Sequence, residues 1–572
     1  MRASFSSKSE AGPKLYSTRK QWHRPMYFEA RVSMQANIHA LEIVFLLLLL
    51  FVVIFGVLAK KLKTPYPIVL VIGGLLLSFV PGIPRINLNP DIVFFVILPP
   101  LLYSAAWLTS WREFSYNLVS ILFLAFGLVT FTVLGVTAAG HWFLTGFDWR
   151  VGLVLGAVVA PTDAIAATSI AKRIGLPKRI VDILEGESLI NDATALLALE
   201  FGIALLVGRE TPTFTFGLLR LSYLVALGIL VGLLIGEIVH FVEHRVDDGP
   251  IEIALSILTP YVAYLTAEAI HASGVLAVVA CGLYLSRKSS HFFSPGVRLQ
   301  IWAVWESLTF ILNGLVFVLI GLQLPYVLGA IRDHNLGTLV VYGALFSAFL
   351  ILLRLMWVYP GAYVANLIRR HILHQNEPMP GSRPLFVLGW TGMRGVISLA
   401  AAIALPQIFE DGTPFVQRNM IIFLAFSVIL VTLVLQGLTL PPLIRGLRLA
   451  GGALQHPEEK QARRAILQAA LNYLNQAREQ AEPEFVEVYD DLSRHYRSRL
   501  ATLQEEENSQ TPADGIDPQL YNRHLELSRK LLAVERQTAI RLRYERRISD
   551  EFLRELEREL DLSESRFMTR QG

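Results

Sequence analysis

The sequence predicts an all-α polytopic membrane protein, and three observations support this fold class. The chain has 572 residues, of which 53% are hydrophobic and only 17% are charged. It contains many apolar runs of about twenty residues, each long enough to cross about 30 Å of hydrocarbon as a helix. These runs are continuous, as in LEIVFLLLLLFVVIFGVLA at 41–59, whereas membrane β-barrel strands show only weak ten-residue alternation.

Charge and cysteine content argue against several other classes of function. The formal net charge of +4 is small for this length, so it does not indicate nucleic acid as a partner. The single cysteine, Cys281, cannot form an internal disulfide. It lies in the apolar run ASGVLAVVACGLYLS, where we expect it to pack as a small hydrophobic residue, and no cofactor is expected.

About thirteen apolar spans are separated by charged residues, proline and glycine. They are predicted at 41–59, 67–81, 91–108, 117–144, 151–171, 180–208, 216–242, 251–269, 272–286, 299–328, 337–368, 385–406 and 420–444. An odd number of spans places the two ends of the chain on opposite sides of the membrane.

Basic residues concentrate in alternate loops between these spans. One set of loops carries Lys60, Lys61, Lys63, Arg112, Lys172, Arg173, Lys178, Arg179, Arg245, Arg287, Lys288, Arg298, Arg369, Arg370 and Arg383. The other set carries Arg85, Arg150, Arg209, Arg332 and Arg418. Loops rich in Lys and Arg stay in the cytoplasm, so the tail that follows the last span is predicted to be cytoplasmic.

The two ends of the chain differ in composition from the apolar region at 39–445. Residues 1–38 are predicted to be a non-essential extension, because positions 1–33 carry seven basic and two acidic residues and would resist translocation. Residues 446–572 are predicted to be a helical tail, since leucines recur at helical spacing there, at 467, 471 and 474. A regulatory or dimer-forming role for the tail and a small solvated helical bundle remain equal alternatives.

The span at 151–171 is interrupted at mid-membrane beside a carboxylate. Pro161 removes a backbone donor and clashes with the carbonyl of Ala157, which frees backbone oxygens near Thr162 and Asp163. Irregular backbone at this depth is tolerated only where it is buried in protein or lines a cavity. We therefore expect a small-cation site at the break, with a simple proline kink and a paired Asp163 as the alternative.

The span at 180–208 carries charged side chains that cost about 2.5–3.5 kcal/mol each at a helix centre. Ser188 and Asp192 are one turn apart on one stripe of the helix, and Glu187 and Asn191 lie on the adjoining stripe. Hard cations such as sodium prefer the oxygen ligands that Ser188 and Asp192 offer. Burial favours the protonated form of a carboxylate, so a proton and a cation are expected to compete for Asp192.

A third interrupted span, at 385–406, contains a lone guanidinium. Arg394 follows a glycine-containing break, and a buried charge of this kind requires a partner. We expect an ion pair with Glu187, because Asp192 must stay free to exchange its ligand. Arg354 is judged to lie nearer a span end, where a long side chain can reach the interface, and it is given no role.

The two broken spans also indicate the symmetry of the fold. The first break lies in the fifth predicted span and the second break in the twelfth. This odd offset places the two halves of the chain in opposite orientation. Inverted repeats with two broken helices that cross near the membrane midplane are typical of secondary transporters.

Five motifs recur in an order and spacing that resemble a known family. They are LPPLLYSAAW, APTDAIAATS, EGESLINDATAL, SGVLAVVACGLYLS and GWTGMRGVISLAAAIALP. Over roughly 38–445 the chain resembles the monovalent cation:proton antiporter family, sodium/proton exchanger type, bacterial branch. The resemblance implies a homodimer that works by elevator-like alternating access. Its core helices would lie at about 117–208 and 337–445, and its dimer helices at about 41–108 and 251–328.

The resemblance also assigns a role to the polar residues at the first break. It implies that Asp192 is the shared cation and proton site. Ser188 and the Thr162 backbone would be further sodium ligands, and Asp163 would be a ligand directly or through water.

Four further residues carry implications of the resemblance. Asn191 precedes Asp192, and in this family an Asn-Asp pair accompanies electroneutral one-for-one exchange. Glu187 and Arg394 would form the stabilising ion pair. Ser104 is a departure, because many relatives have an acidic residue after the LPP motif. The missing carboxylate removes one possible cation ligand, so the cation selectivity stays open. Sodium is favoured, and potassium is the alternative.

The predicted function is therefore antiport across the plasma membrane, and not an enzymatic reaction. The expected partners are sodium, or potassium or lithium, together with protons, the lipid bilayer and a second copy of the chain. A cation channel is disfavoured because one competitive carboxylate suits occlusion better than multi-ion flow. An intramembrane aspartyl hydrolase that uses Asp163 and Asp192 is disfavoured because the sequence lacks its Gly-x-Gly-Asp signature.

Overall fold

The computed structural model describes most of the apolar region and parts of the tail. The described residues are 24–81, 88–143, 147–208, 214–246, 248–292, 295–331, 335–375, 379–409, 412–450, 457–480, 482, 486–505, 531–538, 540–541, 545, 560 and 562–563. The chain divides into two compact units, Met1–Gly452 and Ala453–Gly572. The secondary-structure elements of the described residues are helices, and one isolated β-bridge joins Ile408 and Pro414.

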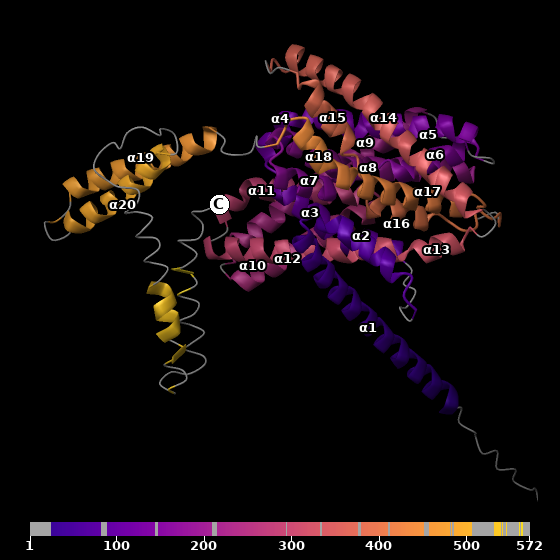
Figure 1. The fold of residues 1–572 in the computed structure, drawn as a ribbon, viewed down its shortest axis with the longest axis horizontal. Helices are drawn as coiled ribbons and strands as arrows, with labels where there is room; N and C mark the ends of the chain where they lie inside the picture. The colour runs from indigo at the N-terminus through magenta and orange to yellow at the C-terminus, as the bar shows by residue number, and fades with distance from the viewer. Residues whose placement is uncertain are drawn as a thin grey trace, which may run out of the picture. The chain divides into compact units, whose positions relative to one another are not determined.

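The first unit is a bundle of helices (Figure 1). It includes three short π-helical segments, η1 to η3. The elements are, in order, α1 (Arg24–Leu62), α2 (Tyr66–Leu77), η1 (Ile92–Ile97), α3 (Leu98–Leu108), α4 (Trp111–Leu122), η2 (Phe123–Leu128), α5 (Val129–Phe143), α6 (Trp149–Val159), α7 (Ala164–Ile174), α8 (Lys178–Val207), α9 (Phe214–Glu243), α10 (Gly249–Ala269), α11 (Gly274–Phe292), α12 (Pro295–Leu322), α13 (Leu324–Gly329), α14 (Leu336–His371), α15 (Ser382–Trp390), α16 (Val396–Ala404), α17 (Arg418–Val431), η3 (Thr432–Gln436) and α18 (Gly437–Gly446).

The predicted spans each overlap one of these helices or a run of consecutive ones. Among the residues that the structure describes, nine helices are long and apolar enough to cross a membrane. Two shorter apolar helices, Tyr66–Leu77 and Ile92–Leu108, accompany them. The prediction of a multi-pass helical membrane protein is therefore confirmed, whereas the number of about thirteen spans and the inverted repeats stay predictions.

The predicted interruption at Pro161 is present between α6 and α7. Residues 160–163 have no regular structure, and Asp163 caps the N-terminus of α7 by accepting a hydrogen bond from the backbone N–H of Ile165 at 2.8 Å. A cap of this kind satisfies one of the donors that a helix start leaves unpaired. The break therefore ends one half-helix and starts the next at a carboxylate.

The second predicted interruption lies between α15 and α16. Residues 391–395 separate Trp390 from Val396, and the backbone N–H of Asp163 donates to the carbonyl of Met393 at 2.8 Å. The two breaks thus contact each other directly. This contact requires a residue without a side chain, because a Cβ on Gly395 would lie 2.7 Å from Asp163 Oδ2.

The continuous helix α8 packs against both parts of the first broken span. It contacts α6 and α7 along with α4, η2 and α11, and α16 in turn contacts α6. These contacts place the polar middle of α8 beside the unwound backbone at 160–163. The fold thereby assembles the predicted site from segments that are far apart in the sequence.

The second unit contains a helical hairpin, in the region where the leucine spacing predicts a helical tail. Its helices are α19 (Pro457–Glu479) and α20 (Val486–Glu505), and Leu467, Leu471 and Leu474 are buried. Arg478 Nε lies 2.6 Å from Asp490 Oδ1 and links the two helices. At the other end of the chain, α1 runs through the predicted boundary at residue 38, and residues 1–23 lie outside the described part.

Candidate ion site

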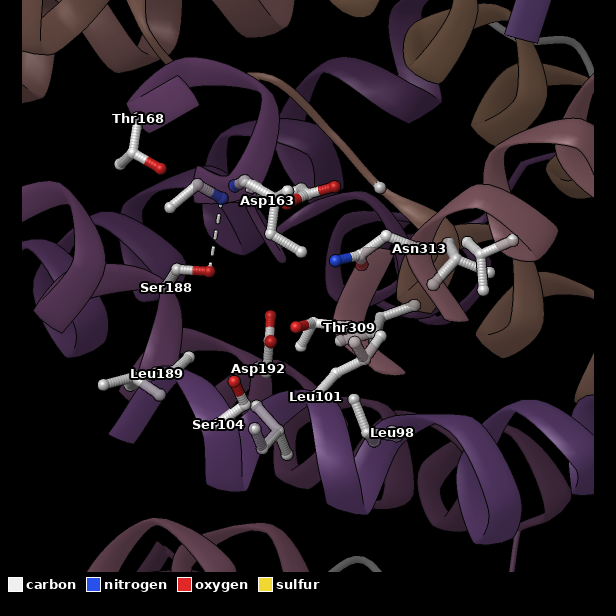
Figure 2. A pocket seen from close by; sticks show the side chains of 18 of the residues that line it. Leu98, Leu101, Ser104, Asp163, Thr168, Ser188, Leu189, Asp192, Thr309 and Asn313 are labelled. Carbon is white, nitrogen blue, oxygen red and sulfur yellow. Dashed lines mark hydrogen bonds between the residues drawn. The ribbon is translucent and has the colours of Figure 1, made fainter. Parts of the chain in front are cut away.

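A cavity of about 370 Å³ opens beside the break at Pro161 (Figure 2). One wall contains the four residues predicted to bind the cation, which are Thr162, Asp163, Ser188 and Asp192. The lining also contains polar residues of α3 and α12, which are Ser104, Thr309 and Asn313. The structure therefore brings the four predicted ligands together around one space.

Asp192 presents its carboxylate to this cavity. The residue is only 5% exposed, and Figure 2 shows its side chain pointing into the space bounded by Ser104, Thr309 and Asn313. One turn earlier on α8, the side chain of Ser188 points into the same space. Ser188 and Asp192 share one stripe of the helix because they are four residues apart.

Ser188 also holds the unwound backbone against α8. Its hydroxyl donates to the carbonyl of Thr162 at 2.9 Å and accepts from the backbone N–H of Ala164 at 3.4 Å. The hydroxyl therefore satisfies groups on both sides of Asp163 that the helix break leaves unpaired. Carbonyl, hydroxyl and carboxylate oxygens are thus gathered within a few residues, and these are the ligands that a hard cation prefers.

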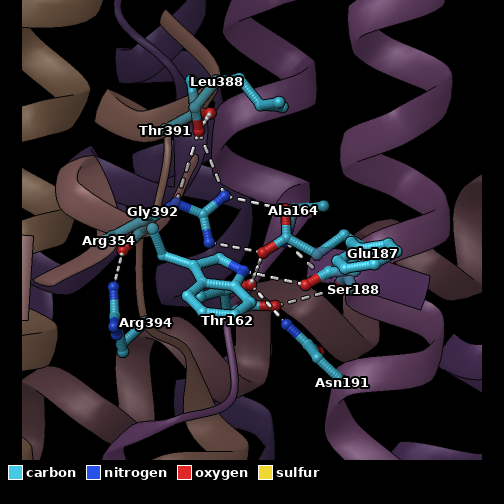
Figure 3. Close-up of polar contacts among 12 residues, drawn as sticks. Thr162, Ala164, Glu187, Ser188, Asn191, Arg354, Leu388, Thr391, Gly392 and Arg394 are labelled. Carbon is cyan, nitrogen blue, oxygen red and sulfur yellow. Dashed lines mark hydrogen bonds and ion pairs between the residues drawn. The ribbon is translucent and has the colours of Figure 1, made fainter. Parts of the chain in front are cut away.

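The ion pair of Glu187 differs from the prediction. Glu187 pairs with Arg354 rather than with Arg394, and its two oxygens lie 2.5 Å and 2.8 Å from Nη1 and Nη2 (Figure 3). Both side chains are 1% exposed. Two parallel N–H···O bonds of this kind form the strong, bidentate arrangement of a guanidinium with a carboxylate.

Arg394 binds backbone oxygens instead of a carboxylate. Its Nε donates to the carbonyl of Val159 at 3.1 Å, and its Nη1 donates to the carbonyl of Gly392. Val159 is the last residue of α6, and the carbonyls at a helix C-terminus carry partial negative charge. The end of α6 at the break thus supplies the compensation for Arg394 that was predicted to come from Glu187.

The sequence did contain a signal for Arg354. The residue lies near the middle of α14 (Leu336–His371), so the assignment to a span end was wrong. A lone guanidinium at the centre of an apolar helix requires a partner in the protein. Two such arginines were present, Arg354 and Arg394, and their positions in the sequence do not decide which one reaches Glu187.

A hydrogen-bond network extends from this ion pair to the first break (Figure 3). The hydroxyl of Thr162 donates to Glu187 Oε1 at 3.1 Å and accepts from the Asn191 side chain at 2.5 Å. Arg354 Nη2 also donates to the carbonyl of Leu388 in α15, at 3.2 Å. The network therefore connects α8, α14 and both broken spans, and it sets the orientation of the Thr162 backbone.

Four further residues have different surroundings. Asn313 is buried and lines the cavity, whereas Glu306 is exposed and lies outside that lining. Glu268 accepts a hydrogen bond from the backbone N–H of Gly274 at 3.2 Å, so it braces the turn between α10 and α11. Cys281 is fully buried, which agrees with its predicted role as a small hydrophobic residue.

A helical membrane bundle in which two broken helices meet beside a buried carboxylate defines the class of ion-coupled secondary transporters. Comparison with known proteins gives the family. Residues 46–446 match the family described as "Sodium/hydrogen exchanger, transmembrane". The chain belongs to this family, whose members are cation/proton antiporters and not enzymes.

Two relatives and one solved structure illustrate the likeness. The chain is 34% identical over 519 residues to an uncharacterised Na+/H+ exchanger of Mycobacterium tuberculosis, covering 90% of this chain and 94% of that protein. It is 34% identical over 459 residues to the sodium, potassium, lithium and rubidium/H+ antiporter of Bacillus pumilus, covering 77% and 66%. The structure of the sodium proton antiporter MjNhaP1 from Methanocaldococcus jannaschii at pH 8 matches with a TM-score of 0.53 at 18% identity. That match covers 71% of this chain and 99% of the other, and it supports the fold alone.

Proposed function

We propose that this protein exchanges a monovalent cation, with sodium favoured, for protons, and that both bind Asp192 in turn. The observation that carries the proposal is the contrast between the two buried carboxylates of α8. Glu187 is held by Arg354, whereas Asp192 faces the cavity. Asp192 is therefore the buried carboxylate of this helix that can exchange one ligand for another.

The proposed cation ligands are the oxygens that surround Asp192. They are supplied by Ser188, by the Thr162 backbone and by Asp163, directly or through water. Asp163 Oδ1 is already engaged by the N–H of Ile165, so Asp163 acts chiefly as a fixed acceptor and helix cap. Sodium fits this set because it is a hard cation that prefers oxygen.

An electroneutral, one-for-one stoichiometry follows from the same groups. Asn191 is a neutral amide, Glu187 is neutralised by Arg354, and Asp163 is a cap. One carboxylate, Asp192, is then left to release a proton for each cation that binds. Asn191 serves as the neighbour of Asp192 and holds Thr162 in place.

The proposed transport cycle is alternating access by movement of a core domain against a dimer domain. The cavity supports this division, because its two walls come from different sets of helices. Asp163, Ser188 and Asp192 lie in the proposed core, at 117–208 and 337–445, whereas Ser104 and the polar residues of α12 lie in the proposed dimer helices. We further propose a homodimer in the plasma membrane with the tail at 446–572 in the cytoplasm.

Potassium/proton exchange at the same residues is the second candidate. Ser104 lines the cavity and offers a hydroxyl where a carboxylate would bind a small cation more strongly. A relative from Bacillus pumilus is named for sodium, potassium, lithium and rubidium. Comparison of sodium and potassium as driving cations in the same vesicles separates the two candidates.

The test of the proposed function is cation-driven proton movement in proteoliposomes. Wild-type protein is expected to alkalinise or acidify the lumen according to the direction of the sodium gradient. Asp192→Asn is expected to reduce the rate of this movement about a hundredfold or more, because the amide cannot alternate between proton and cation. The variant is expected to elute as a folded species. Glu306→Gln, an exposed carboxylate outside the cavity, is the matched control and is expected to retain activity. Exchange that persists in Asp192→Asn would exclude Asp192 as the shared site.

A further inference from the structure

The cavity that contains Asp192 continues as a polar groove between α7 and α8. Besides Ser188 and Asp192, its lining includes Thr168, Ser169 and Lys172 of α7 and Glu185 of α8. Positions 185, 188 and 192 follow the i, i+3, i+7 spacing and therefore share one face of α8. Seven residues of helix separate Glu185 from Asp192, which corresponds to about 10 Å along the axis.

An ion pair lies at the outer end of this groove. Lys172 Nζ is 2.7 Å from Glu185 Oε1, and the two side chains are 63% and 24% exposed. Lys172 belongs to the last turn of α7, where the helix dipole favours a positive charge. A cation that travels along the groove toward Asp192 passes close to this pair, because both residues line the same cavity as Asp192.

We propose that Lys172 and Glu185 form an entrance gate that sets the apparent affinity for the cation. Glu185 is the first carboxylate that an incoming cation meets, and the ammonium of Lys172 is a tethered competitor for it. The cation displaces the ammonium, passes Ser188 and reaches Asp192. This inference rests on the proposed antiport function and adds a step that precedes binding at Asp192.

The exposure of Lys172 makes the competition reversible. Exposed ion pairs are weak and are screened by salt, so the ammonium leaves Glu185 readily. Other charges of this region are Asp182, one turn before Glu185, and a second pair formed by Lys178 and Glu113 at 2.9 Å. The second pair has similar exposure, 52% and 34%, yet neither of its residues lines the cavity. It provides a matched control for the effect of surface charge alone.

The test compares KM and Vmax for sodium in proteoliposomes that contain Glu185→Gln, Lys172→Gln, the double variant or Glu113→Gln. Glu185→Gln is expected to raise KM about two- to tenfold with Vmax retained, because it removes attraction at the entrance and leaves Asp192 intact. Lys172→Gln is expected to lower KM about two- to fivefold, since the competitor is gone. In the Glu185→Gln background, Lys172→Gln is expected to have no further effect.

Ionic strength provides a second readout that a purely structural role would not change. The KM differences are expected to shrink when about 0.5 M choline chloride is added, because the Debye length falls below the distance between the entrance and Asp192. Unchanged KM in Lys172→Gln, or an equal shift in Glu113→Gln, would overturn the gate. Loss of exchange in the wild-type protein would instead overturn the proposed function, so the two failures are distinguishable. Lys172 is largely exposed, and its variant therefore decides the question even if Glu185→Gln folds poorly.

Discussion

At the scale of single residues, two carboxylates five positions apart on α8 have different surroundings. Glu187 is enclosed by a guanidinium and a hydroxyl, and Asp192 faces a cavity. The helix repeat explains the difference, because five residues rotate a side chain by about 500°, well away from the original stripe. One carboxylate thus becomes part of the scaffold and the other remains available for ligands.

The Glu187–Arg354 pair gives a prediction about stability. Removal of one partner leaves an uncompensated buried charge, so Arg354→Met is expected to destabilise the protein by about 3–5 kcal/mol. The double variant Arg354→Met with Glu187→Gln is expected to recover most of that loss, because the orphaned carboxylate is gone. Thermal unfolding in detergent, followed by tryptophan fluorescence, measures both effects. A double variant that is no more stable than Arg354→Met would contradict the importance of charge compensation at this pair.

At the scale of elements, the two interruptions could be predicted because their causes are local. Pro161 removes a helix donor whatever surrounds it, and glycines near residue 392 weaken the other helix. Two features could not be predicted. One is the contact of Gly395 with Asp163, and the other is the pairing of Glu187 with Arg354. Both depend on how spans that are more than 150 residues apart pack together.

The contact between α8 and the first break gives a prediction about binding. Ser188→Ala removes the hydroxyl that bonds the Thr162 carbonyl and lines the cavity. We expect KM for sodium to rise about tenfold, because one ligand and the bond that positions another are lost together. Ser347→Ala is the control, since its buried hydroxyl bonds within its own helix, to the carbonyl of Gly343 at 2.6 Å. Equal KM values for the two variants would show that Ser188 does not contribute to the site.

At the scale of the whole molecule, composition was sufficient to predict a multi-pass helical bundle, and the described helices confirm it. The predicted spans overlap the observed helices because apolar runs bounded by charge have few alternatives in a membrane. The homodimer and the moving domains stay predictions, because they concern a second chain and a second conformation. Leucine spacing predicted a helical tail, and α19 and α20 are helical, but their pairing as a hairpin was not predicted.

Electroneutral exchange predicts that transport is indifferent to the membrane potential. A net charge moved in each cycle would contribute about 2.3 kcal/mol per 100 mV to the driving force. Sodium-driven proton movement in proteoliposomes is therefore expected to keep the same rate when a potential of about 100 mV of either sign is imposed. Acceleration by one sign and slowing by the other would contradict one-for-one exchange.

If one proton and one cation compete for Asp192, KM for sodium must depend on pH, and this dependence can be measured in proteoliposomes. In the acidic range, each unit of lower pH raises the proton concentration tenfold, so competition by a single proton raises KM about tenfold per unit. At alkaline pH the proton no longer competes, and KM is expected to reach a plateau. We therefore expect a plot of log KM against pH with a slope of about −1 that levels off at high pH. A KM that does not change with pH would contradict a shared site. A slope near −2 would show that two protons, one of them on a second group, compete with the cation.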